Sequence, residues 1–361
     1  MTAPSTIATK FLPAKDQLGL VAVGFSGGQC KSGVDAAPSA LIESGLLTDI
    51  QETLEYTLYH DGIVHGYAKH LPAPGTDLPL HVAGAKAPMI NPISVSNVTH
   101  TLCDQVYEHA SKGRLVLTLG GDHSIAIGSV SGTAKAIRER HNSEMALIWV
   151  DAHADINTPE SSGSGNIHGM PVSFLTGITK APKENPNIFG WIKDEHKVNP
   201  SNIVYIGLRD VDIPEKKILK DHGIRAFSMH DIDRYGIGKV MDMALDHINC
   251  GPGQEGMPIH LSFDVDALDP YVAPSTGTPV RGGLTLREGD FICEVIHETG
   301  YLVAMDLVEV NPALSGDGPE SIGAKETIRA GCSLVRCALG ECLLDRYCVT
   351  DIHNIRLFSA I

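Results

Sequence analysis

The sequence predicts a single α/β domain, doubly wound around a mostly parallel central sheet of about eight strands, with helices on both faces. Its strand-like runs are nearly continuously apolar, which is typical of strands that helices cover on both sides. Helix-like segments alternate with these runs, as they do in doubly wound sheets. Hydrophobic residues occupy 43% of the 361 positions and charged residues only 20%, which is enough for a large core. We expect the domain to span residues 17–361, after a poorly ordered N-terminal extension over residues 1–16.

The elements follow one another without a change of composition that would mark a second domain. Runs rich in β-branched and aliphatic residues predict strands over residues 18–25, 114–119, 146–150, 202–206, 259–263 and 301–310. Apolar residues at helical spacing predict helices over residues 37–47, 98–111, 125–140, 239–248, 286–298 and 320–339. Segments rich in Pro, Gly and polar residues predict loops over residues 72–79, 159–166 and 251–258.

Charge and composition exclude several classes of partner. The 28 basic and 43 acidic residues give a formal net charge of −15, whereas nucleic acids and anionic membranes attract basic surfaces. No apolar run reaches the roughly 18–20 residues that span a bilayer. The eight cysteines are scattered, unlike those of a small disulfide-rich secreted domain. We therefore expect a cytoplasmic protein with reduced thiols, which binds neither nucleic acid nor membrane.

Polar side chains follow four of the predicted strands, at the edge where open α/β sheets bind their ligands. In chain order they are His123, Asp151, His153, Asp155, Asp264, Asp266 and Glu309. Alternation along an extended chain places Asp151, His153 and Asp155 on one side, and it does the same for Asp264 and Asp266. Gly120 and Gly121 allow the close backbone approach that would turn His123 inward. We expect all these side chains to share one cleft.

The composition of this cleft indicates a pair of metal ions. Four carboxylates within a few ångströms repel one another unless a cation lies between them. Two imidazoles and four carboxylates are too many ligands for one ordinary site, but they suit two divalent ions that share carboxylates. Oxygen-rich ligation without thiolate favours Mn²⁺ over structural Zn²⁺. With a bridging hydroxide the centre keeps a net negative charge, which Glu309 increases, so we expect a cationic, planar substrate group such as guanidinium.

The chain resembles the eukaryotic-type members of the arginase family of ureohydrolases over nearly its whole length. The motifs that carry the resemblance are GGDHS at 120–124, DAHADINTP at 151–159, SGNIHG at 164–169, GLRDVD at 207–212, SFDVDALDP at 262–270, TGTPVRGGLT at 276–285 and EVNP at 309–312. Residues 33–47 are also similar to the first helix of the family. Several long motifs in the family's order are far more specific than a single Asp-x-His pair.

The resemblance implies a binuclear hydrolase that cleaves the guanidinium of L-arginine, giving L-ornithine and urea, by attack of a metal-bridging hydroxide. It implies two Mn²⁺ per chain, one held by His123, Asp151, Asp155 and Asp264, the other by His153, Asp151, Asp264 and Asp266. Asp151 and Asp264 would bridge the two ions. In this scheme Glu309 orients the guanidinium, Asp155 carries a proton to the departing amine, and His168 acts as a proton shuttle.

The same resemblance assigns the contacts of the α-amino-acid end. Asn157 and Ser164 would hydrogen-bond the α-carboxylate, and Asp212 would take the α-ammonium with help from Glu215. Thr278 would lie near the guanidinium. The Asp212 assignment is open, because the same motif offers Asp210, which could instead pair with Arg209. The family also implies a homo-oligomer, a trimer or a hexamer built from two trimers, in which the tail 350–361 could pack against a neighbour.

Three other functions compete with this interpretation. An agmatinase would share the chemistry but would have no use for carboxylate-binding groups such as Asn157 and Ser164. A metal-dependent deacylase would need only one Zn²⁺, whereas His123 and Asp266 supply ligands for a second ion. A regulatory subunit with an inactive site would require the loss of at least one ligand, and none is missing.

Three further patterns are interpreted as structural. The segment 28–32 (GQCKS) is similar to a phosphate-binding loop, but Cys30 stands where that motif requires glycine. His60, His65 and His70 are spaced five apart, which suits neither helical nor strand ligation, so we expect exposed side chains. Cys332, Cys337 and Cys342 have the same spacing and are expected to be core thiols.

Overall fold

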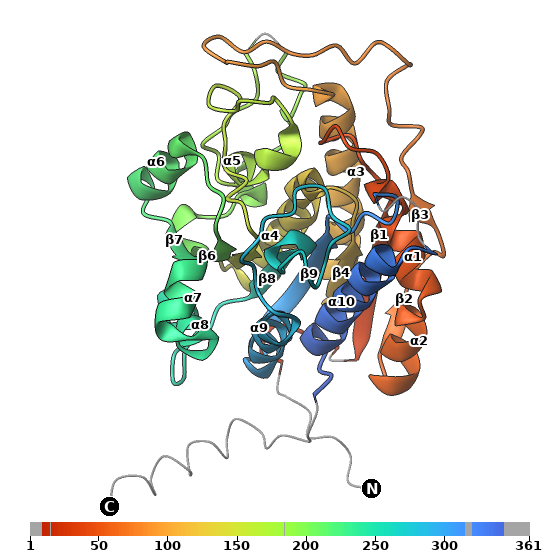
Figure 1. Ribbon diagram of the computed structural model, residues 1–361, viewed down its shortest axis with the longest axis vertical. Helices are drawn as coiled ribbons and strands as arrows, with labels where there is room; N and C mark the ends of the chain where they lie inside the picture. Colours follow the sequence, from red (N-terminus) through yellow and green to blue (C-terminus); the bar gives the residue numbers. More distant parts are fainter. Residues whose placement is uncertain (1–8, 15, 184, 315–319, 343–361) are drawn as a thin grey trace, which may run out of the picture.

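A sheet of nine strands, all paired in parallel, organises the chain (Figure 1). The computed structural model describes residues 9–14, 16–183, 185–314 and 320–342. The strands are β1 (Gln17–Val23), β2 (Thr57–Tyr59), β3 (Val64–His65), β4 (Leu115–Leu119), β5 (Ala146–Val150), β6 (Ile203–Leu208), β7 (Arg225–Ser228), β8 (Ile259–Asp264) and β9 (Leu302–Val308). Their order is β2-β1-β4-β9-β8-β5-β6-β7, with β3 beside β1. The predicted fold class is confirmed.

Helices cover both faces of this sheet. They are α1 (Ala37–Glu43), α2 (Leu46–Thr48), α3 (Pro92–Ala110), α4 (Ala126–His141), α5 (Pro171–Leu175), α6 (Ile213–Asp221), α7 (Met229–Tyr235), α8 (Ile237–His247), α9 (Leu286–Glu298) and α10 (Ile322–Ala338). Helix α4 packs against α3 and contacts β8 and β9, whereas α10 packs against α9 in front of the sheet in the view of Figure 1. The close approach of α3 and α4 requires glycine, because a Cβ at Gly128 would lie 2.4 Å from the carbonyl oxygen of Thr99.

Short turns of other helical types complete the described secondary structure. Turns of 3₁₀ helix span Val34–Ala36, His123–Ile125, Ile167–Gly169, Asp194–His196, Pro200–Asn202 and Val265–Ala267, and a π-helical turn spans Asp49–Thr53. Three of them, beginning at His123, Ile167 and Val265, lie at the candidate site described below.

The sequence missed the short and half-exposed elements. Strands β2, β3 and β7 have two to four residues, of whose side chains only that of Phe227 is buried, so they contain no continuous apolar run. Helix α6 has nine residues, of which only Glu215 and Leu219 are buried. Burial on both faces produced the pattern that identified the six longer strands, and these edge elements lack it.

The N-terminal segment joins the core earlier than expected. Residues 1–8 and 15 of the predicted extension lie outside the described residues, as does the tail 350–361. Phe11 and Leu12 are buried in the main hydrophobic cluster, and Arg140 Nη2 donates to the carbonyl oxygen of Phe11 at 3.0 Å. The described part of the segment 9–14 therefore packs against the domain.

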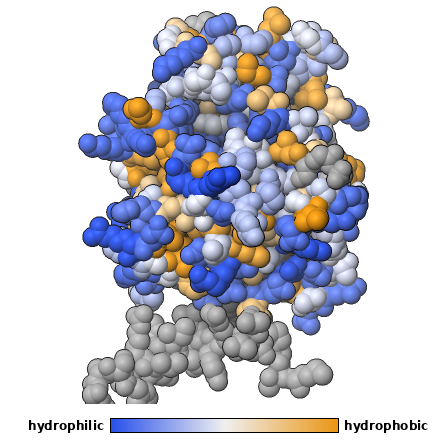
Figure 2. Space-filling view, viewed as in Figure 1, coloured by the Kyte–Doolittle hydropathy of each residue, from blue (hydrophilic) through white to orange (hydrophobic). Residues whose placement is uncertain are grey.

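The surface of the domain carries both hydrophobic and hydrophilic residues. Figure 2 shows hydrophobic residues in groups among hydrophilic ones on the face in view. In the described part of the chain, no helix is long and apolar enough to cross a membrane.

Cys332 and Cys337 are buried free thiols as expected, but Cys342 is exposed. His70 is exposed as expected, whereas His60 and His65 are half-buried. His65 bonds Asp61 and stacks on Tyr67.

Candidate active site

The site lies at the carboxyl ends of four strands that are neighbours in the centre of the sheet, β4, β9, β8 and β5. These are the four strands after which the sequence places its acidic and imidazole side chains. His123 follows β4, the segment 151–155 follows β5, Asp264 ends β8 and Glu309 follows β9. Because parallel strands end at the same edge, residues far apart in the sequence meet there.

Turns, rather than strand alternation, orient the side chains, which corrects the sequence-based reasoning. The backbone bends directly after β5, and Asp155 adopts a left-handed conformation with φ 47°. Asp266 lies in the 3₁₀ turn Val265–Ala267, and its N–H donates to Asp264 Oδ1 at 2.7 Å. Extended alternation ends with the strand, and capping hydrogen bonds of this kind then decide the direction of each carboxylate.

The predicted close approach at the two glycines before His123 is borne out. A Cβ at Gly121 would lie 1.8 Å from the carbonyl oxygen of Phe25, and one at Gly120 would lie 2.4 Å from Ile125 Cδ1. Asp122 accepts from the N–H of Ser124 and so caps the turn that carries His123. The chain can therefore turn back into the sheet edge, with His123 fully buried.

His123 forms the centre of a first group of ligand-type side chains. Its Nδ1 lies 3.2 Å from Asp151 Oδ2, 3.3 Å from Asp155 Oδ2 and 3.1 Å from Asp264 Oδ2. Its Nε2 lies 2.9 Å from Ser262 Oγ, so that Nδ1 faces the three carboxylates. Trp149 stacks on the imidazole with ring centroids 3.9 Å apart. Ser262 and Trp149 had not been predicted, because they belong to apolar strands whose pattern signals only burial.

A second group surrounds His153 and shares one carboxylate with the first. His153 Nδ1 lies 3.4 Å from Asp151 Oδ1 and 3.2 Å from Asp266 Oδ2. Asp151 therefore uses its two oxygens toward the two imidazoles, as a bridging ligand would. Thr278 Oγ1 donates to Asp266 Oδ2 at 2.9 Å, so Thr278 contacts this group directly. The contribution of Asp264 to the second group stays a prediction.

The carboxylates of the two groups are buried close to one another, which makes their negative charges unfavourable unless cations are bound. Burial, followed by the charges of Asp266 and Asp151, raises the pKa of Asp264 well above its usual range. Burial and the charge of Asp151 raise the pKa of Asp266 to about 6. Two imidazoles cannot neutralise four buried carboxylates. The donor atoms of His123, Asp151 and Asp155 lie within 4.8 Å of one another, as do those of Asp151, His153 and Asp266. The donor set therefore fits divalent ions.

Glu309 lies at the inner end of the site and is 1% exposed. Its Oε1 accepts from the N–H of His123 at 3.0 Å and lies 3.1 Å from His168 Nδ1. Its Oε2 accepts from Gln29 Nε2 at 3.0 Å. Glu309 also has a left-handed backbone, with φ 63°, so its position directly after β9 is closely determined. It is not part of the cavity wall, which His168 forms in front of it.

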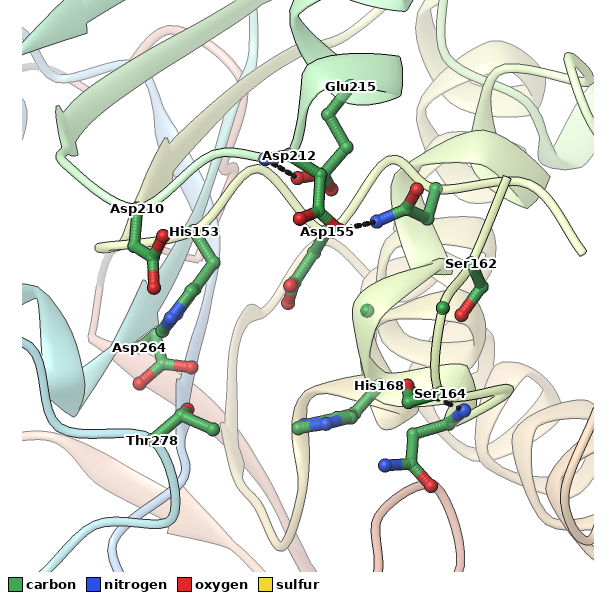
Figure 3. Close-up of a pocket in the computed structure, with 14 residues that line it drawn as sticks. His153, Asp155, Ser162, Ser164, His168, Asp210, Asp212, Glu215, Asp264 and Thr278 are labelled. Atoms are coloured by element: carbon green, nitrogen blue, oxygen red, sulfur yellow. Dashed lines mark hydrogen bonds between the residues drawn. The ribbon is translucent and has the colours of Figure 1, made fainter. Parts of the chain in front are cut away.

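A cavity of about 250 Å³ opens above the two groups (Figure 3). The sequence-predicted residues on its wall are His153, Asp155, Asn157, Ser164, His168, Asp212, Glu215, Asp264 and Thr278. Figure 3 shows His153, Asp264 and Thr278 on one side, Ser162 and Ser164 on the other, and Asp155 between them. Burial alone would lower the pKa of His168, but the hydrogen bond and the charge of Glu309 outweigh it and raise the pKa to about 9.

The outer part of the cavity consists of polar groups that hold one another. Asn157 Nδ2 donates to Asp212 Oδ2 at 3.0 Å. Glu215 accepts from the N–H groups of Ile156 and Asp212, at 3.1 and 2.9 Å, and so ties the start of α6 to the segment that follows Asp155. Burial raises the pKa of Glu215 to about 7. Glu215 thus has a structural role beside any contact with a ligand.

Five further wall residues had not been assigned a role from the sequence, namely Ser162, Gly163, Asn166, Gly169 and Asp210. The suspected pairing of Asp210 with Arg209 is wrong. Arg209 instead donates to main-chain carbonyl oxygens, among them those of Asp266 and Val280. It therefore ties the turn that carries Asp266 to the segment beyond Thr278. The position of Asp210 in a strand-end loop was the signal that could have identified it.

Comparisons with known proteins identify the family of the chain. The sequence profile of the arginase family matches residues 16–340. The arginase of Neurospora crassa is 65% identical over 340 residues, which cover 94% of this chain and 90% of that protein. The crystal structure of a cold-adapted arginase from Glaciozyma antarctica is 47% identical with a TM-score of 0.69, covering 93% of this chain and 98% of that one.

A third relative carries a ligand. The structure of Entamoeba histolytica arginase in complex with L-ornithine is 29% identical with a TM-score of 0.72, covering 89% of this chain and 98% of that one. The family model, the sequence identity and the fold therefore agree over nearly the whole chain. The chain belongs to the arginase family and is a hydrolase of that family.

Proposed function

We propose that the protein hydrolyses L-arginine to L-ornithine and urea with two Mn²⁺ per chain. The observation that carries this proposal is the pair of His/Asp groups that share Asp151 at the base of a polar cavity. The name of the Neurospora crassa relative and the L-ornithine bound to the Entamoeba histolytica relative support the same substrate.

The six clustered side chains would hold the metal ions. His123, Asp151, Asp155 and Asp264 would ligate one ion, and His153, Asp151, Asp264 and Asp266 the other. Carboxylate and imidazole ligation without thiolate suits Mn²⁺. When bound, the ions would activate a water molecule for attack on the guanidinium carbon. Ser262 and Trp149 would hold His123 and Asp151 in position for ligation.

The chain itself would bind the guanidinium and handle protons. The buried charge of Glu309 makes the inner end of the site favourable for a cation. Thr278 lies on the cavity wall, where it could contact the guanidinium. Asp155 projects into the cavity, where its carboxylate would pass a proton to the departing amine. His168 would hold a proton on the Nδ1 that faces Glu309 and would exchange the proton on its Nε2.

Polar groups of the outer cavity would select an α-amino acid. Asn157 and the Ser164 hydroxyl can donate to an α-carboxylate, and Asp212 can accept from an α-ammonium. Agmatine lacks the carboxylate, so it cannot accept the hydrogen bonds that Asn157 and Ser164 would donate to L-arginine. The loss of these hydrogen bonds disfavours the smaller substrate.

Two measurements test this function. Urea release from L-arginine and agmatine would be compared in the purified protein after removal of metal and after reloading with Mn²⁺. We expect chelation to abolish urea release, Mn²⁺ to restore it, and L-arginine to be strongly preferred. Metal analysis should give two Mn²⁺ per chain, and His123→Asn should lower the content toward one. A single Zn²⁺ per chain, or equal use of both substrates, would contradict the proposal.

The assembly and the location are proposed from the sequence. We expect a homo-oligomer, a trimer or a pair of trimers, in the cytoplasm. Sedimentation equilibrium of the full chain tests the assembly, and a monomer at all concentrations would contradict it.

A further inference from the structure

The loop 24–32 leads from β1 to the site. Its segment 28–32 is similar to a phosphate-binding loop but has Cys30 where that motif requires glycine. The loop follows β1, so it ends at the same edge of the sheet as the metal-type ligands. Its glycines serve close packing: a Cβ at Gly28 would lie 2.4 Å from Asp122 Oδ1. The Gly28 N–H and the Lys31 ammonium, which a phosphate-binding loop would offer to its ligand, instead bond Asp122 and the carbonyl oxygen of Gly277.

Hydrogen bonds join this loop to three functional segments. Gly28 N–H donates to Asp122 Oδ2 at 2.8 Å, and the carbonyl oxygen of Gly28 accepts from the N–H of His168 at 3.0 Å. Lys31 Nζ donates to the carbonyl oxygen of Gly277, the residue before Thr278. The loop is thus held against the segments that carry His123, His168 and Thr278, and its backbone is well defined at each side of Gln29.

Gln29 is a buried polar side chain of this loop, with 7% exposure. Its Nε2 donates to Glu309 Oε2 at 3.0 Å. The other oxygen of Glu309 is engaged by the His123 N–H and by His168. Among the residues that the structure describes, Gln29 is the hydrogen-bond donor to Oε2. Without it the Glu309 carboxylate would be held through Oε1 alone, and Oε2 would have no donor among the described residues.

We propose that Gln29 is a positioning residue for the guanidinium end of the site, which acts through Glu309. This inference rests on the proposed function. Gln29 fixes the plane of the Glu309 carboxylate, and the carboxylate in turn determines the negative charge at the inner end of the cavity and the orientation of His168. Gln29 does not line the cavity, so it has no contact with the α-amino-acid end of a substrate.

The test uses two variants that keep the size of the side chain, in Mn²⁺-loaded full-length protein. Gln29→Met removes the donor, and Gln29→Glu replaces it by a like charge beside Glu309. A buried hydrogen bond to a charged group corresponds to about 10- to 100-fold, so we expect kcat/KM for L-arginine to fall by that factor in Gln29→Met and at least as far in Gln29→Glu.

L-ornithine provides the readout that a merely structural role would not separate. It has the same α-amino-acid end as L-arginine but a compact ammonium in place of the planar guanidinium, so its inhibition constant should change far less than kcat/KM for L-arginine, and the metal content should be unchanged. Ser32→Ala is the matched control in the same loop, because the carbonyl oxygen of Ser32, not its exposed side chain, bonds Asn311. Ser32→Ala should behave as the unmodified protein does.

Two results would overturn the inference. One is an unchanged kcat/KM for L-arginine in Gln29→Met. The other is a parallel loss of L-ornithine inhibition and bound metal, which would mean that Gln29 only supports the fold of the loop. Failure of the proposed function itself is distinguishable, because the unmodified protein would then release no urea from L-arginine.

Discussion

Two clusters of histidine and aspartate lie on the same strands, and they differ in the ratio of carboxylates to imidazoles. The outer cluster, at the carboxyl ends, has four carboxylates and two imidazoles around a cavity. The inner cluster has one of each: His260 Nε2 on β8 lies 2.9 Å from Asp306 Oδ2 on β9. Ser129 Oγ donates to the same oxygen at 2.6 Å, and Thr133 Oγ1 lies 3.2 Å from His260 Nδ1. All four inner residues are fully buried.

The difference shows what makes a polar cluster a candidate metal centre. The inner pair holds one imidazole for one carboxylate, and hydroxyls of α4 bond Asp306 Oδ2 and His260 Nδ1, although the buried Asp306 Oδ1 has no hydrogen-bond partner among the described residues. The outer cluster has an excess of negative charge that only added cations can balance. His260, Ser262 and Asp264 occupy alternate positions of β8, so Ser262 lies between the two clusters and bonds His123 of the outer one.

The largest expected effect is the loss of a carboxylate from the outer cluster. Asp264→Asn should lower both Mn²⁺ content and urea release by more than about 100-fold, since even an outer-sphere partner of a metal ligand typically contributes 10- to 100-fold. Metal analysis and initial rates measure it. Asp306→Asn is the matched control, and it should keep its metal and its activity. Equal losses in the two variants would remove the distinction between the clusters.

The next effect concerns stability rather than activity. Asp306→Ala leaves His260 without its partner in the core, which should lower the free energy of unfolding by about 3–5 kcal/mol. Urea denaturation of the metal-free protein measures this change. Activity per folded molecule should persist after reloading with Mn²⁺. An unfolding curve that matches the unmodified protein would show that the inner pair contributes nothing to stability.

Ser262→Ala, at the position of β8 between the two clusters, should have a smaller effect. Loss of the hydroxyl that faces His123 Nε2 should weaken Mn²⁺ binding by about 10- to 100-fold, because such partners fix the orientation of a ligating imidazole. Titration with Mn²⁺ in a metal buffer gives the affinity directly. If the affinity is unchanged, the orientation of His123 depends on Trp149 alone.

The smallest effect is expected at the far end of the cavity, where neither cluster is touched. Asn157→Ala should raise KM for L-arginine by about tenfold, the value of one good hydrogen bond, with far less effect on agmatine. Steady-state kinetics with both substrates measures the difference. Parallel changes for the two substrates would contradict the assignment of Asn157 to the α-carboxylate.

Much of the site could be predicted because its residues follow apolar strands. That rule locates His123, the segment 151–155, Asp264 and Glu309 from residue pattern alone, and the family motifs supply Asn157, Ser164 and Asp212. The same rule also applies to Gln29, which follows β1, but the similarity of its loop to a phosphate-binding loop suggests the wrong chemistry. Ser262 and Trp149 could not be identified, because a residue within an apolar strand looks the same whether it packs or supports a ligand.

The sequence by itself determined the fold class, the strands of the sheet centre and the set of residues available for metal binding. These features depend on local patterns, burial periodicity and residue type, which a linear chain displays directly. Only the tertiary structure decided that turns rather than strand alternation direct the carboxylates, that Gln29 contacts Glu309, and that His260 pairs with Asp306. Those contacts join residues up to 280 positions apart, and their geometry depends on strand order and on distances that no local pattern contains.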